Sequence, residues 1–73
     1  MNSETTMIYD DVQNRWLVDL NNRFYGLHCG ECFDLVIGND RIPCRLELDR
    51  DWFVIIQDVR MNLRTQDSYK VII

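Results

Sequence analysis

The sharpest chemical feature of the sequence is the run His28-Cys29-Gly30-Glu31-Cys32, in which two cysteines stand three positions apart. Cysteines at this spacing can share a zinc ion. The candidate ligands of such a site are Cys29, Cys32, Cys44 and His28. Alternation along the flanking segments argues against it, because Cys32 is expected on an outer face and Cys44 on an inner face. We therefore expect no structural metal.

The same two cysteines could instead form a redox pair. Thioredoxin-type chemistry places the first cysteine at a helix N-terminus, where the dipole lowers the pKa of the thiol. The residues that follow, 33–37, have strand character rather than helical character. We therefore expect no redox catalysis, and we interpret Gly30 as the centre of a tight turn between two small cysteine side chains.

No other group of residues in the sequence points to catalysis. His28 is the single histidine, and the three glycines are too dispersed to form a phosphate-binding loop or a dinucleotide fingerprint. The close carboxylates of Asp10-Asp11 and Asp49-Arg50-Asp51 are expected to bond to their own backbone in turns. The sequence predicts a protein that is not an enzyme and that uses no cofactor.

Seven of the eight basic residues are arginines, which form planar, bidentate contacts with phosphate or carboxylate. Several fall on expected outer faces, and together with an aromatic side chain they could form a nucleic-acid groove. This candidate set is Arg41, Arg45, Arg60, Arg64 and Trp52. The net charge of -4 weighs against nucleic acid and against anionic membranes, since both require a surplus of positive charge.

The elements that must position these residues are strands, because apolar side chains recur with period two along most of the chain. The runs predict about six or seven short strands, and a chain of 73 residues is one domain. We expect residues 1–6 to be disordered and residues 7–73 to form an all-β antiparallel barrel or roll, SH3-like as first choice and OB-like as second. The predicted core is Trp16, Val18, Phe33, Leu35, Ile37, Leu46, Leu48, Val54, Val59, Met61 and Leu63.

The sequence has no apolar run near the roughly 20 residues of a membrane span. Its first residues also lack the basic and apolar regions of a signal peptide. We therefore expect a cytoplasmic protein.

Three central segments carry a family resemblance: 27–35, 41–47 and 51–53. The specific parts are the His-Cys-Gly-x-Cys-Phe and Ile-Pro-x-Arg-x-Glu runs. They resemble a domain-of-unknown-function family of very short Firmicutes proteins, often encoded on plasmids, phages and integrative elements, over roughly residues 15–56. The resemblance implies a bacterial origin and a small β-rich fold. It implies no catalytic residue and no partner.

The leading functional hypothesis is a non-enzymatic interaction module that binds a protein partner, or itself, through an exposed sheet face. Leu17, Val36 and Ile72 each lie one residue from core-facing neighbours, so they are expected to point outward and to form an interface. One alternative is a barrel that binds single-stranded or duplex nucleic acid. Another is an acidic inhibitor of a host DNA-acting enzyme. An apolar patch would favour the first hypothesis, a carboxylate-free arginine stripe the second, and a continuous acidic face the third.

Overall fold

The computed structural model describes residues 3–73, which form eight antiparallel strands in one sheet. The strands run in the order β3-β2-β1-β8-β4-β5-β6-β7. Their bounds are β1 Glu4–Asp10, β2 Arg15–Leu20, β3 Arg23–Gly26, β4 Cys32–Ile37, β5 Asp40–Leu48, β6 Trp52–Ile56, β7 Val59–Asn62 and β8 Tyr69–Ile72. The predicted all-β class is confirmed.

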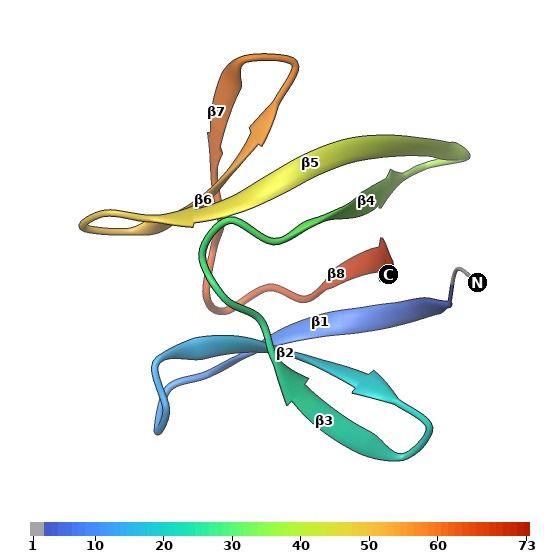
Figure 1. Ribbon diagram of the computed structural model, residues 1–73, viewed down its shortest axis with the longest axis vertical. Helices are drawn as coiled ribbons and strands as arrows, with labels where there is room; N and C mark the ends of the chain where they lie inside the picture. Colours follow the sequence, from blue (N-terminus) through green and yellow to red (C-terminus); the bar gives the residue numbers. More distant parts are fainter. Residues whose placement is uncertain (1–2) are drawn as a thin grey trace.

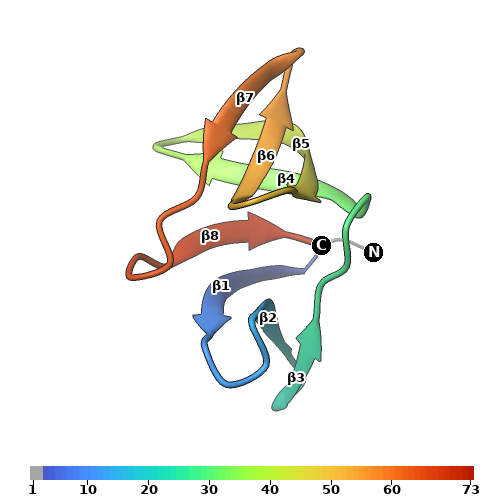
Figure 2. The same cartoon turned by 90° about the vertical axis from the view of Figure 1, so that its left-hand side faces the viewer.

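Two meanders make up the sheet, and the last strand joins them. Strands β1 to β3 follow one another as hairpins, as do β4 to β7, and β8 returns to pair with both β1 and β4 (Figure 1). The sheet curls so that the two meanders lie above and below β8 (Figure 2). The result is a small barrel- or roll-like body whose core lies on the inner face of the sheet.

The curl does not close into a hydrogen-bonded ring. Within residues 3–73, β3 pairs only with β2 and β7 pairs only with β6. The sheet therefore keeps two open edges, one at each end of the strand order. An open edge carries backbone N–H and C=O groups that another strand can bind.

Two of the hairpins turn through pairs of residues with positive φ. Asn21 and Asn22 have φ of 55° and 65°, as a two-residue hairpin loop of type I′ requires. Asparagine tolerates this left-handed conformation, so this residue pair suits the turn. Gln57 and Asp58 adopt φ of 50° and 65° between β6 and β7.

The core is one cluster drawn from both meanders and β8. Its buried members are Met7, Trp16, Val18, Leu27, Phe33, Leu35, Cys44, Leu46, Trp52, Val54, Leu63 and Val71, with Met61 packed against them. Three core predictions are wrong: Ile37 is 49% exposed, Leu48 44% and Val59 64%. All three lie at strand ends, and Val59 lies on an open edge. Alternation gives the face of a residue but not how far along the strand the core extends.

The prediction that residues 1–6 are disordered is wrong for residues 4–6. Strand β1 begins at Glu4, and residues 4–7 pair with β8. Ser3 also exchanges two backbone hydrogen bonds with Ile73, each 2.9 Å long. The apolar pattern misses this pairing because residues 4–6 are polar, and their backbone rather than their side chains binds β8. Residues 1 and 2 lie outside the described residues.

Residues 3–73 include no helix of the length and apolar character that crossing a membrane requires.

Candidate functional site

The cysteine run forms a tight turn at the start of β4. The backbone N–H of Glu31 donates to the carbonyl oxygen of His28 at 3.2 Å, and Gly30 has φ of 90°. A positive φ at this position of a turn favours glycine. The Glu31 carboxylate also accepts a hydrogen bond of 2.7 Å from the backbone N–H of His28. Two further bonds attach Gly30 and Glu31 to Leu46, so the turn is anchored to β5.

The three cysteines are all free and lie in different surroundings. Cys29 and Cys32 are exposed, whereas Cys44 is buried on the inner face of β5. Burial raises the pKa of the Cys44 thiol to about 12, and the nearby Asp34 and Cys32 add to the effect. In the described part of the chain, no three His, Cys, Asp or Glu side chains converge to hold a metal ion. Cys32 and Cys44 lie on opposite faces of the sheet, and the structure does not assemble the four zinc candidates.

The arginines of the nucleic-acid candidate set are each placed beside an acidic group. The ion pairs are Arg41–Asp34 at 2.9 Å, Arg45–Glu47 at 2.7 Å, Arg60–Asp49 at 2.7 Å and Arg64–Asp67 at 3.6 Å. The aromatic member of the set, Trp52, is buried on the inner face and does not join the arginines of the outer face. The aromatic ring that an arginine meets is that of Phe53, with the Arg60 guanidinium 3.8 Å from its centroid. The outer face of β4 to β7 is therefore a mixed surface.

Asp49 is held by its own turn and by a neighbouring strand. Its carboxylate accepts hydrogen bonds from the Arg60 guanidinium and from the backbone N–H of Asp51. These bonds, that of Arg60 first, lower the pKa of Asp49 to about 2. Asp10 likewise accepts a bond from the Val12 backbone N–H. The prediction that these carboxylates serve local turns is confirmed for Asp10 and Asp49, and the Asp49 carboxylate is also held by Arg60.

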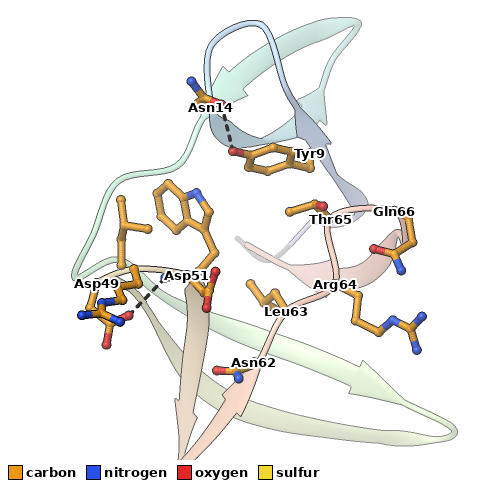
Figure 3. Close-up of a pocket in the computed structure, with 12 residues that line it drawn as sticks. Tyr9, Asn14, Asp49, Asp51, Asn62, Leu63, Arg64, Thr65 and Gln66 are labelled. Carbon is orange, nitrogen blue, oxygen red and sulfur yellow. Dashed lines mark hydrogen bonds between the residues drawn. The ribbon is translucent and has the colours of Figure 1, made fainter.

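A cleft of about 650 Å³ opens where three distant turns meet (Figure 3). The β1–β2 hairpin supplies Tyr9 and Asn14, whose side chains share a hydrogen bond of 3.3 Å. The other walls are the β5–β6 turn, with Asp49 and Asp51, and the segment 62–66 after β7. The lining mixes amides, hydroxyls and charged groups with the apolar side chains of Leu48, Trp52 and Leu63. Sequence analysis missed this cleft because its walls come together only in the folded chain.

Exposed apolar side chains gather on the outer face of the first meander. Leu17 on β2 is half-buried and lies directly opposite Ile8 on β1, which is 38% exposed. Phe24 on β3 is 61% exposed and lies diagonally across from Leu17, within reach of its side chain. We call Ile8, Leu17 and Phe24 the outer patch. Sequence analysis identified Leu17 but missed Ile8 on β1 and Phe24 on the four-residue strand β3.

The remaining interface candidates lie elsewhere on the same face. Ile72 on β8 is opposite Asp34 on β4, and Val36 is the next outward residue along β4; both are half-buried. The cross-strand pair of Thr6 and Lys70 lies between this region and the outer patch. The structure therefore does not bring Leu17, Val36 and Ile72 into one cluster.

One known family of protein domains matches this chain. The family described as "Domain of unknown function (DUF5348)" matches residues 5–73. The chain belongs to this family. The match confirms that the resemblance is to a domain of unknown function, and extends it from the central segments to nearly the whole DUF5348 chain.

A solved crystal structure of a protein from Ruminococcus gnavus is similar to this DUF5348 chain. The two are 34% identical, and the match covers 97% of this chain and 100% of the other, with a TM-score of 0.78. No curated protein matches the chain. This similarity supports the all-β fold of the chain.

Proposed function

We propose that this DUF5348 chain is a small, non-enzymatic module that binds protein through the outer face of β1 to β3. The observation that carries the proposal is the outer patch, in which Phe24 and Ile8 lie exposed beside Leu17 and next to an open sheet edge. Burying such side chains gains roughly 1.5–3 kcal/mol each relative to leaving them in water. Exposed aromatics that can be buried in this way are typical anchors of protein interfaces.

The charged side chains on the surface give less support to nucleic-acid binding and to an acidic inhibitor. A nucleic-acid groove would need arginines free to meet phosphates, whereas Arg41, Arg45 and Arg60 each bind a carboxylate within 3 Å. An acidic inhibitor would need a continuous acidic face to match the net charge of -4. The same ion pairs mix positive charge into the acidic surface, which weakens a mimic of DNA.

The source and compartment belong to the proposal as well. We infer a bacterial protein of the Firmicutes, encoded on a mobile element, from the sequence resemblance and from the similar protein of Ruminococcus gnavus. We infer a cytoplasmic location because all three cysteines are free, which is typical of a reducing compartment. An SH3-like or OB-like classification of the barrel stays a prediction.

Affinity capture from a bacterial lysate, with and without nuclease, tests the proposal. We expect the chain to retain a protein partner or a second copy in both arms, and Phe24→Ser and Leu17→Ser to lose it. Val59→Ser is the matched control, because Val59 is equally apolar and 64% exposed but lies on β7. Capture that needs intact nucleic acid, or capture that survives both outer-patch substitutions, contradicts the proposal.

A further inference from the structure

The open edge at β3 presents unpaired backbone groups in a regular pattern. Antiparallel pairing turns the N–H and C=O of alternate residues toward the neighbouring strand. Leu27 donates its N–H to Trp16 of β2, so residues 23, 25 and 27 of this segment face β2. Phe24 and Gly26 therefore turn their backbone groups away from β2. Since β3 pairs with no other described strand, these four groups face the open edge.

The two open edges of the sheet differ in how they are protected. At the β7 edge, Arg60 is held by Asp49 and by the Asn62 side chain, which places charge along the strand. Charged side chains on an edge discourage a further strand from pairing. At the β3 edge the charged residue, Arg23, lies at the start of the strand, and the two central residues are Phe24 and Tyr25, which are 61% and 47% exposed. The β3 edge is thus the one suited to strand addition.

We propose that two copies of this chain associate by antiparallel pairing of β3 with β3, with Tyr25 on the two-fold axis. The inference rests on the proposed function, because it names a second copy as the partner that contacts Phe24 of the outer patch. Strand addition of this kind takes affinity from main-chain hydrogen bonds and specificity from the alternating side chains. Here the two sheets become one continuous sheet across the dimer.

The register follows from the backbone groups that are free. With Tyr25 opposite Tyr25 of the second copy, Phe24 lies opposite Gly26 of that copy, and the converse holds by symmetry. Each Phe24–Gly26 pair exchanges two hydrogen bonds, so all the outward N–H and C=O groups of both strands are satisfied. Arg23 then faces Leu27 of the second copy. This register keeps the two Arg23 side chains at opposite ends of the interface and avoids like-charge contact.

The same register explains why Phe24 is exposed in the single chain. On the outer face, Leu17 lies opposite Gly26, and Ile8 lies opposite Leu17. Phe24 of the second copy therefore extends the row of Ile8, Leu17 and Gly26. An aromatic ring compensates well for a glycine on the neighbouring strand.

The Arg15 side chain lies above Gly26 and can contact that ring. A Cβ atom added at Gly26 would lie 2.7 Å from the Arg15 Cδ and 2.8 Å from one guanidinium nitrogen. The Arg15 side chain therefore covers Gly26 on the outer face. An incoming Phe24 ring lies beside this guanidinium, within reach of a favourable cation–π contact.

Cross-linking with a single introduced cysteine tests the register. In the background of Cys29→Ser and Cys32→Ser, we expect Tyr25→Cys to form an intermolecular disulfide in air. The Cα atoms of directly opposed, non-hydrogen-bonded residues are about 4.5 Å apart, which a disulfide can span. Val59→Cys in the same background is the control and is expected to stay monomeric. Equal cross-linking of the two variants overturns the β3 register.

Sedimentation equilibrium on the native chain tests the association itself. We expect a dimer whose dissociation constant rises at least tenfold with Phe24→Ser and with Gly26→Pro, which removes an outward N–H. Circular dichroism verifies that each variant folds. A native chain that stays monomeric at millimolar concentration overturns the dimer. If lysate capture still depends on Phe24 in that case, the proposed function stands and only its partner is wrong.

Discussion

Cys29, Cys32 and Cys44 have the same side chain, but their surroundings give the three thiols different reactivity. Two of them are exposed at the turn before β4, while Cys44 is only 5% exposed within the core. Burial disfavours the thiolate, and the negative Asp34 nearby disfavours it further, which raises the pKa of Cys44 to about 12. Since the thiolate is the nucleophile, we expect Cys44 to react slowly in the folded chain.

Thiol labelling checks this difference. A disulfide reagent at mildly alkaline pH is expected to modify Cys29 and Cys32 quickly and Cys44 only after denaturant is added. The double variant Cys29→Ser, Cys32→Ser should show no fast phase. Three thiols reacting at similar rates in the folded native chain would mean that Cys44 is not enclosed.

Asp49 gives a second residue-scale prediction, in its dependence on pH. The Arg60 hydrogen bond lowers the pKa of Asp49 from 3.8 to about 2, so the folded state favours the carboxylate. The stabilisation is present above the unfolded pKa and disappears as the pH falls through the folded pKa. We expect Asp49→Asn to lower the denaturant midpoint slightly at neutral pH, because the pair is exposed, and to lose most of this effect as the pH falls to about 2. A difference that is unchanged at acid pH would show that ionisation is not its cause.

At the scale of elements, alternation correctly assigned most side chains to a face. Trp16 and Val18 on β2, and Phe33 and Leu35 on β4, are buried as predicted. The pattern could not show where the core ends along a strand. For that reason it predicts a buried Ile37, which the structure shows to be exposed. It could not identify the outer patch either, because neighbours such as Ile8 and Leu17 lie on separate strands whose register is set only by the fold.

Strand β5 offers a matched pair for testing the core boundary. Leu46 and Leu48 face the same side, but Leu46 is fully buried and Leu48 is 44% exposed. We expect Leu46→Ala to lower the free energy of unfolding by about 2–5 kcal/mol, since it leaves a cavity. Leu48→Ala should cost no more than about 1 kcal/mol. Chemical denaturation measures both, and equal losses would contradict the boundary.

The whole molecule depends on strand β8, which no local pattern could place. Its sequence predicts a strand, but its position between β1 and β4 depends on contacts with segments far away in the chain. The cleft and the open β3 edge are products of the same arrangement. Because residues 4–6 are polar, the apolar pattern predicts a disordered tail there. Their backbone instead pairs with β8 and so joins the two meanders.

Deleting residues 1–6 tests the importance of this junction. The deletion removes three of the four paired positions between β1 and β8, together with the Ser3–Ile73 hydrogen bonds. At about 1 kcal/mol for each bond, the loss approaches the roughly 3–5 kcal/mol available to so small a domain. We expect the truncated chain to be largely unfolded by circular dichroism. Thr6→Ala, which keeps the backbone, should fold; a stable truncated chain would contradict the architecture.

The central claim is that two copies of this chain meet at the open edge of β3. A series of ¹H–¹⁵N correlation spectra, from micromolar to millimolar protein, tests it most directly because every backbone amide is observed separately. The account predicts concentration-dependent shifts at Ile8, Leu17, Phe24 and Gly26, with slowed amide exchange at Phe24 and Gly26. Shifts confined to Arg41, Arg45 and Arg60 or to the cleft, or the absence of any shift across the series, would contradict it.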